Sequence, residues 1–301
     1  MSAPLGGGDR IVVGYTATKA GRDAVAFASR LAAASGSALH LVLVLPAQKP
    51  GIVPPDAGYE RLVREQAAGW LREGAATVPE EIPHRAHVRY GESVAAGLVD
   101  TADELGASLI VVGGADGGHR GRHRLGTTAT ELVHSSDVPV ALVPRGARRI
   151  TLETGITRLT AAVGEREGTE LLVEETIRLA AATGVPVRLL SLVALDLPAG
   201  LDTGAIRTVS DTHAQEVLGE VRSALPADAD VTAVVAAGDG IEDAAGQLEW
   251  EAGEIVLVGS SRLAQPRRLF LGSTAARMLR VVTAPMIVVP RTRSEREGAS
   301  A

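Results

Sequence analysis

An internal repeat constrains this 301-residue chain more than any other feature of the sequence. Gly259 follows Gly113 by 146 positions, and three further pairs keep that spacing: Gly126 and Gly272, Pro139 and Pro285, Pro144 and Pro290. The run LAAASG at 31–36 returns as LAAATG at 179–184, 148 positions later. A duplication accounts for these matches. We therefore expect two tandem domains, residues 9–148 and 149–293, joined between residues 145 and 157. Residues 1–8 should form a flexible tail and residues 294–301 a disordered one.

Each half alternates short apolar runs with longer segments of helical periodicity. In the first half the predicted strands cover residues 11–16, 39–46, 84–90, 108–113 and 138–144, and helical patterns fill the segments between them. This alternation predicts an α/β fold in which each half forms a doubly wound, mostly parallel five-stranded sheet. Aromatic residues make up only 2% of the chain, so the core must consist of Val, Leu, Ile and Ala. Such a core suits parallel sheets covered by helices.

Two glycine-containing loops stand at matching places in the repeat. In each, an apolar strand ends at a glycine, a basic loop follows, and a glycine with a hydroxyl residue opens a helix. The free N–H groups and the positive dipole end of such a helix attract anions. A glycine and a hydroxyl residue before a helix also serve as an ordinary cap, and that alternative stays open. The residues concerned are Gly113, Gly126 and Thr127 in the first half and Gly259, Gly272 and Ser273 in the second.

The fold class predicts where a ligand would bind. In doubly wound sheets, ligands collect beyond the carboxyl ends of the strands, where the strand order reverses. If the first strand neighbours the fourth, this crevice is lined by Gly14, Tyr15, Thr16 and the loop that begins at Gly113. Small residues and a helix N-terminus at this crevice suit a mononucleotide, with adenine near the first strand and phosphates near the basic loop.

These features resemble the universal stress protein family in its tandem, two-domain form, over nearly the whole chain. The resemblance implies an adenine-nucleotide alpha-hydrolase-like, or flavodoxin-like, sandwich in each half. Nucleotide-binding members carry the signature G-x2-G-x9-G-(S/T), which wraps ribose and phosphates. In the first half Gly113, Gly126 and Thr127 match it, and Asp116 stands at the second glycine. The matching residues of the second half are Gly259, Gly272 and Ser273, with Arg262 at the second glycine.

The adenine side also departs from the family pattern. Thr16 stands where those members have an Asp, and residues 158–168 offer no equivalent of that Asp or of the glycine before it. A carboxylate at Asp116 would repel a triphosphate, whereas Arg262 can pair with phosphate or fill the cleft with its bulk. The residues predicted to bind nucleotide are Gly14, Tyr15, Thr16, Val44, Gly113, Asp116, Gly126, Thr127, Thr128, Gly259, Arg262, Gly272, Ser273 and Thr274.

Composition excludes several other functions. A formal net charge of −6 and seven Phe, Trp and Tyr residues argue against nucleic-acid binding. The chain has no cysteine, which excludes disulfides and thiolate chemistry but leaves the compartment open. It has no signal core and no apolar run long enough for a bilayer, so we expect a cytoplasmic protein without a membrane partner. Six of the seven histidines lie in the first half, but their spacing fits no metal site, and we expect them to be solvated. The chain has neither a phosphate loop of the G-x4-G-K-(S/T) type nor a G-x-S-x-G elbow.

Three further expectations concern packing. Tyr59, Trp70 and Trp250 at helical positions should pack in the interior, and the acidic run 165–175 should form the exposed first turns of a helix. The apolar fifth strands of the halves, 138–144 and 284–290, need cover. In the family that this chain resembles, this strand pairs across a two-fold axis. We therefore expect the two halves to pair as an intramolecular pseudo-dimer, which leaves a further homodimer open.

Three functions remain on the sequence alone. The first is a stress-response protein that binds ATP or another adenine nucleotide, with or without magnesium, chiefly in the first half. It would regulate an unknown protein partner and show at most slow ATP turnover, since no general base is placed. The second is a nucleotide-free interaction scaffold with degenerate sites. The third is an ATP-dependent adenylating transferase, which would need a substrate pocket. Fold analogy alone does not decide among them.

Overall fold

A computed structural model describes residues 9–47, 57–115, 123–164, 169–194, 214–219, 221–223, 229–260 and 271–290. Both tails predicted from the sequence lie outside these residues. The strands are β1 (Arg10–Gly14), β2 (Ala38–Pro46), β3 (His84–Gly91), β4 (Leu109–Gly113), β5 (Val140–Val143), β6 (Leu159–Ala162), β7 (Val187–Ala194), β8 (Val231–Gly238), β9 (Ile255–Gly259) and β10 (Met286–Val289).

Helices alternate with these strands, as the periodicity predicts. They are α1 (Lys19–Ser35), α2 (Ala57–Ala75), α3 (Val94–Leu105), α4 (Thr127–Ser135), α5 (Thr169–Thr183), α7 (Ile241–Gly246) and α8 (Ser273–Met278), with a 3₁₀ turn η1 (Ala147–Arg149). Residues 214–219 and 221–223 are also helical. Gly36 ends α1 in the left-handed conformation (φ 70°), and the Ser93 side chain caps α3 by accepting from Ala96 N. The α/β alternation and the mostly parallel sheet confirm the predicted fold class.

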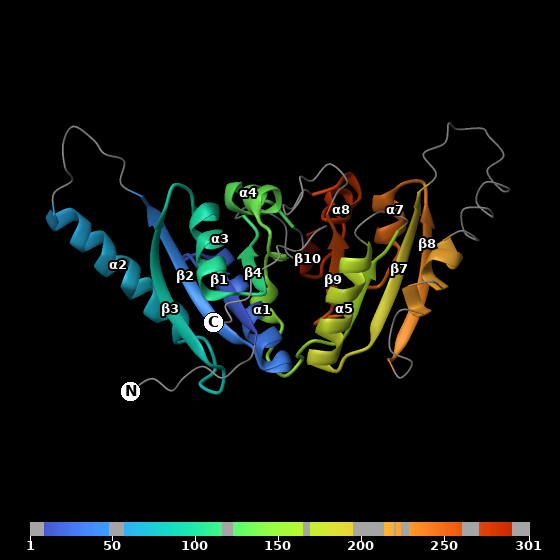
Figure 1. The fold of residues 1–301 in the computed structure, drawn as a ribbon, viewed down its shortest axis with the longest axis horizontal. Coiled ribbons are helices and arrows are strands. Elements are labelled where there is room, and N and C mark those ends of the chain that lie inside the picture. The colour runs from blue at the N-terminus through green and yellow to red at the C-terminus, as the bar shows by residue number, and fades with distance from the viewer. Residues whose placement is uncertain are drawn as a thin grey trace, which may run out of the picture.

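The ten described strands form one sheet in the order β3-β2-β1-β4-β5-β10-β9-β6-β7-β8. All neighbours are parallel except β5 and β10, which pair antiparallel with Ile287 opposite Ala141. The five-stranded sheets expected from the sequence are thus joined at the centre of the molecule (Figure 1). β1 neighbours β4, which is the condition on which the ligand crevice was predicted, and β3 lies at an edge of the sheet.

Helices cover both faces of the sheet because successive side chains of each strand point to opposite sides. Ile11 and Val13 pack on one face with α1, α2, α5 and the helix at residues 214–223. Val12 packs on the other face with α3, α4, α7 and α8. Each apolar face is therefore continuous across both halves, which ties the two domains together.

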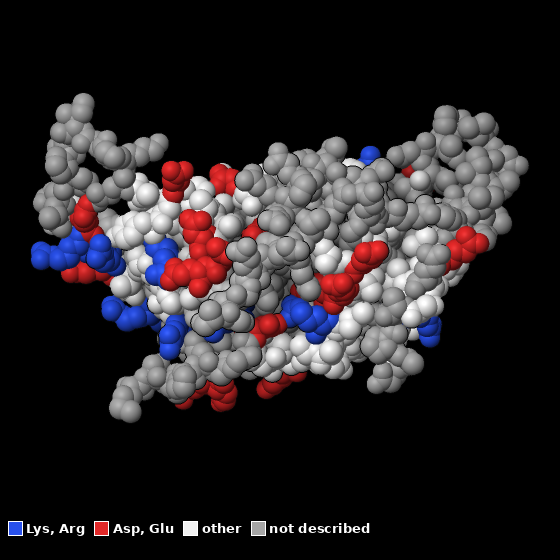
Figure 2. Space-filling model, in the orientation of Figure 1, with Lys and Arg blue, Asp and Glu red and all other residues white. Residues whose placement is uncertain are grey.

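The surface carries charged side chains of both signs, and the described helices lack the features of membrane-spanning ones. Figure 2 shows basic and acidic side chains side by side over the end of the molecule that carries α2 and β3. Within the described ranges, no helix combines the length and the apolar character that crossing a bilayer requires.

Candidate functional site

A cleft of about 260 Å³ opens in the second half beyond the carboxyl ends of β6 and β9 and beside the start of α8. Three residues predicted from the sequence, Gly259, Gly272 and Thr274, line it. Ser273, also predicted, is exposed next to them and is not among the lining residues. The lining residues are Ala162, Val163, Gly164, Thr169, Leu172, Leu190, Leu192, Ala194, Ile241, Val258, Gly259, Ser260, Gly272, Thr274, Ala275 and Met278.

Small residues keep the floor of this cleft open. A Cβ atom built on Gly259 or on Gly164 would meet no described atom within 4 Å. Gly272 is the N-cap of α8, and its carbonyl accepts from Ala276 N at 2.9 Å. The N–H groups of the first helical turn have no acceptor within a helix. The cleft therefore joins open space to donors that suit an anion.

Gly164 is the residue that sequence reasoning missed. Val163 N donates to Leu190 O at 2.9 Å, just as Tyr15 N donates to Val42 O at 2.9 Å in the first half. The strand register thus places Gly164 at the position of Thr16, 148 residues apart, the offset that also relates the two LAAA(S/T)G runs. That offset could have located the residue, although the surrounding sequence is unlike the first half.

The wall of the cleft is apolar. Leu190, Leu192, Val258 and Met278 contribute aliphatic side chains, and among the described lining residues none is charged. Such a wall fits a flat, uncharged group better than a second anion. Arg262, predicted to bind nucleotide from the position of the second motif glycine, lies outside the described residues.

In the first half, the predicted glycines have packing roles. A Cβ on Gly113 would lie 2.1 Å from Ala20 O, because the first turn of α1 lies directly against this end of β4. A Cβ on Gly14 would lie 2.9 Å from Leu98 Cδ1. Gly113 therefore requires glycine for packing, whether or not a ligand binds, because the added atom would meet backbone. At Gly14 the contact is with the end of the Leu98 side chain, and a shift of that side chain would relieve it.

The other predicted side chains near β1 and β2 point in different directions. Tyr15 is buried in the core against Gly74, and desolvation raises its pKa. Thr16 is exposed, and its hydroxyl lies 3.0 Å from that of Thr18, the residue that caps α1. Val44 is half-buried against α3. Of these predicted side chains, only Thr16 is exposed.

The start of α4 repeats the start of α8. Gly126 is the N-cap, and its carbonyl accepts from Thr130 N at 2.9 Å. Thr127 is exposed and Thr128 half-buried in the first turn. Ala115 N donates to Arg124 O at 2.7 Å and closes the base of the preceding loop. Asp116, predicted to lie at the nucleotide site, is outside the described residues.

The histidines are less solvated than the sequence predicts. His40 is 2% exposed, and its Nδ1 lies 2.9 Å from Nε2 of His87, with the two rings stacked. His123 donates through Nε2–H to Ala284 O of the other half, at 2.8 Å. The expectation of solvation is wrong here because these rings fill interior positions. In the described part of the chain, no cluster of three or more His, Cys, Asp or Glu side chains could hold a metal ion.

Burial lowers the pKa of His40 to about 4, and the neighbouring His87, Arg10, Arg85 and Arg89 act in the same direction. Burial also lowers the pKa of His123 to about 4, although its hydrogen bond to Ala284 opposes the shift. Both rings are therefore neutral at pH 7.

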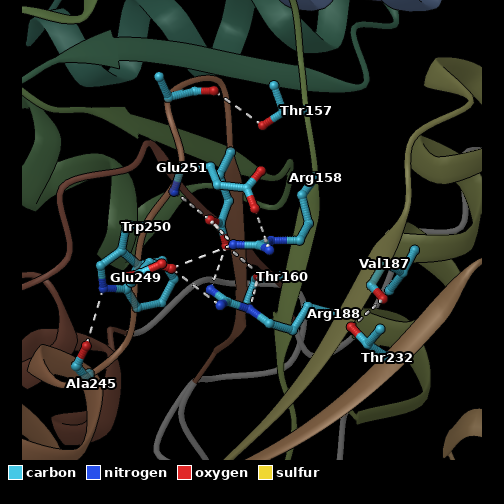
Figure 3. Close-up of polar contacts among 12 residues, drawn as sticks. Thr157, Arg158, Thr160, Val187, Arg188, Thr232, Ala245, Glu249, Trp250 and Glu251 are labelled. Atoms are coloured by element: carbon cyan, nitrogen blue, oxygen red, sulfur yellow. Dashed lines mark hydrogen bonds and ion pairs between the residues drawn. The ribbon is translucent and has the colours of Figure 1, made fainter.

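A buried ionic cluster lies at the amino ends of the second-half strands, opposite the cleft (Figure 3). The fully buried carboxylate of Glu254 accepts from Arg158 at 2.8 Å, from Arg188 at 2.6 Å, from the Thr160 hydroxyl and from Glu251 N. Four donors thus satisfy one carboxylate, which compensates for its burial. We call these five residues the Glu254 cluster.

The aromatic predictions had mixed outcomes. Trp250 is half-buried, stacks on the Arg188 guanidinium at 4.9 Å and donates to Ala245 O, so it packs as expected. Its predicted helical position is wrong, because α7 ends at Gly246. Tyr59 and Trp70 are 65% and 39% exposed, so their predicted burial is wrong. The apolar stripe of α2 is wider than the part of it that the sheet covers.

The acidic run also differs from its prediction at one residue. Glu175 is 5% exposed and lies 2.6 Å from Arg178, whereas Glu170 and Glu174 are exposed as expected. Glu175 is buried because α5 turns this position toward the junction between the halves.

The fold and the cleft together define a tandem α/β protein with two copies of a doubly wound domain. The universal stress protein family model matches residues 8–144 and 155–290. Universal stress proteins of Mycobacterium tuberculosis and Mycobacterium bovis are 32% identical over 295 residues, covering 93% of this chain and 99% of each relative. The chain belongs to the universal stress protein family, with two copies of its domain.

Solved structures share the same fold. A universal stress protein from Archaeoglobus fulgidus superposes with a TM-score of 0.67 at 16% identity, covering 93% of this chain and 98% of the other. A Pseudomonas aeruginosa protein described as a universal stress protein gives a TM-score of 0.58 at 15% identity, covering 95% and 94%. These likenesses show the two-domain architecture.

Proposed function

We propose that this chain binds ATP or another adenine nucleotide in the second-half cleft and uses occupancy to change its surface for a protein partner. The observation that carries the proposal is the cleft itself. Gly164 lines it together with the motif residues Gly259, Gly272 and Thr274. Its volume of about 260 Å³ lies just below the roughly 300–1,000 Å³ of small-molecule sites. The base and ribose would fill the cleft, and the phosphates would extend past the start of α8.

The chemistry of the cleft supports this orientation. Leu190, Leu192 and Met278 offer an apolar wall for the base, and the N–H groups that open α8 face the phosphates. Magnesium would bind through the phosphates, because none of the described lining residues supplies a carboxylate. Without a general base among these residues, the expected role is regulatory, with at most slow hydrolysis.

Binding in the first half remains part of the proposal. Gly126, Thr127 and Thr128 open α4 as their counterparts open α8. The close packing of Gly113 on α1 gives that glycine a structural role, so its presence is weaker support for a ligand than the open space at Gly259.

Thermal unfolding with and without ATP tests the proposal. A ligand at 100 times its dissociation constant stabilises a protein by about 2.7 kcal/mol, which is a measurable rise in Tm. We expect ATP at millimolar concentration to raise Tm, and mass spectrometry of the freshly purified protein to detect a carried adenine nucleotide. No rise in Tm with or without magnesium, together with no carried nucleotide, would favour the scaffold alternative.

A further inference from the structure

A second cavity, of about 320 Å³, lies between the two halves, and we call it the junction groove. The first half contributes the turns that precede β4 and β5. The second half contributes one face of α5 and the end of β10. The lining residues are Ala107, Ser108, Asp137, Val138, Pro139, Leu171, Glu175, Arg178, Val289 and Pro290.

The corresponding place beside α1 is filled by the chain itself. The segment after β5 lies along α1, where the Asp23 carboxylate accepts from Gly146 N at 2.8 Å and from Arg148 N at 3.0 Å. The Arg30 guanidinium donates to Ala147 O at 3.0 Å and to Ile150 O at 2.8 Å. Asp23 and Arg30 lie on the same face of α1, two turns apart, and both bind backbone groups of the interdomain linker.

The internal repeat relates the junction groove to this place. The 148-residue offset puts Leu171 at the position of Asp23 and Arg178 at the position of Arg30. A proline ends the fifth strand in each half, and Pro290 is the last described residue of the chain. The groove is therefore the second-half counterpart of the place that the linker occupies, and it begins where the described chain ends.

Charge indicates what the groove would accept. Asp137 and Glu175 supply two carboxylates, and Arg178 pairs with Glu175 and with Asp9. The eleven residues that follow Pro290 read RTRSEREGASA, with arginines at its first and third positions. These arginines complement the carboxylate of Asp137, because Glu175 is already paired with Arg178 through both of its oxygens.

We propose that the C-terminal segment from Arg291 to about Arg296 binds in the junction groove, as residues 145–150 bind beside α1. Because both halves line the groove, the bound segment fastens one domain to the other. A partner that displaced it would loosen the junction. This inference does not depend on nucleotide binding.

The absence of cysteine from the chain makes a direct test simple. Thr292 corresponds to Gly146 by the 146-residue offset, and Gly146 contacts Asp23. The proposed binding would therefore bring the two thiols of the double variant Leu171→Cys/Thr292→Cys within disulfide reach. The control is Leu62→Cys/Thr292→Cys, since Leu62 is 63% exposed on α2. Both proteins are oxidised with oxidised glutathione, and mass spectrometry measures the intramolecular disulfide.

We expect the L171C variant to form its intramolecular disulfide at least about ten-fold faster than the L62C control. Equal rates would overturn the proposal. Disulfides that form only between two molecules would also overturn it, because the groove would then hold the segment of a second copy.

A second comparison tests the charge argument. In the L171C/T292C background, R291E/R293E should lower the rate of disulfide formation to that of the control. Asp137→Lys should restore the rate in that charge-reversed background. An unchanged rate in R291E/R293E would contradict recognition by Asp137.

Discussion

The two halves place different polar groups at the same buried position of the same sheet. In the first half His40 lies opposite Val12 in the strand register and stacks on His87. In the second half Arg188 lies opposite Thr160 and binds Glu254. A neutral aromatic pair thus stands where the other domain has an ionic cluster. After the duplication, the strand register of the sheet stayed the same in both halves, while the polar side chains at this buried position changed.

The halves differ again at the carboxyl ends of their strands. Gly113 is packed against the first turn of α1, whereas a Cβ on Gly259 would meet no atom of the described residues within 4 Å. The same motif glycine therefore has a packing reason in one domain and a ligand-binding opportunity in the other. A matched motif position does not imply a matched function.

The largest expected effect is at the Glu254 cluster. Glu254→Gln leaves two guanidiniums with less than their full compensation, and removal of one partner from a buried pair costs about 3–5 kcal/mol. Denaturant unfolding followed by Trp250 fluorescence, in a Trp70→Phe background, should show this loss in the second half. The control Glu251→Gln removes a carboxylate that is 49% exposed and should cost about 1 kcal/mol or less. Equal losses in the two variants would show that the cluster does not stabilise this domain.

Acid should destabilise the first half through His40. Its pKa is lowered from 6.5 to about 4, so the unfolded chain binds a proton more readily between these values. Stability is then fully present above pH 6.5 and falls as the pH drops toward 4, by about 2–3 kcal/mol at pH 4.5. His40 faces Arg10, Arg85, Arg89 and His87, and Glu104 opposes the lowering at His87.

Unfolding at pH 7 and pH 4.5, followed by Trp70 fluorescence in a Trp250→Phe background, measures this dependence. His40→Leu should flatten it, and the exposed His134→Gln should leave it unchanged. His123 has a similarly lowered pKa at the junction between the halves and should account for part of the remaining slope. A slope that His40→Leu does not change would contradict the role of the buried pair.

The glycine comparison gives a smaller effect on stability and a clear difference between halves. Gly113→Ala places a methyl group 2.1 Å from Ala20 O and should cost about 1–3 kcal/mol, the usual range for overpacking. Gly259→Ala meets no described atom and should change stability by about 0.5 kcal/mol or less. Thermal unfolding of the two variants measures both values. A larger loss from Gly259→Ala would reverse our account of these positions.

Periodicity and the repeat predicted the fold well, because strand and helix patterns depend on local sequence. The start of α4 after Gly126 was predicted correctly for this reason. Gly164 was missed because its equivalence to Thr16 depends on strand pairing and not on residue type. The burial of His40 was missed because histidine is a polar residue type, and its cover by α3 and β3 depends on tertiary packing that the local sequence does not show. For Tyr59 and Trp70 the error is the opposite, because burial was predicted and both side chains are exposed. Periodicity shows an apolar stripe on a helix but not how much of that stripe other elements cover.

The central claim, nucleotide binding in the second-half cleft, is tested most directly at one matched position. Gly164→Phe fills the cleft, and Thr16→Phe makes the same change at the equivalent exposed position of the first half. Isothermal titration with ATP, on variants whose thermal unfolding shows that they are folded, compares the two. The account predicts at least about ten-fold weaker binding in Gly164→Phe and unchanged binding in Thr16→Phe. Loss of binding in Thr16→Phe, with Gly164→Phe unaffected, would contradict it and assign the nucleotide to the first half.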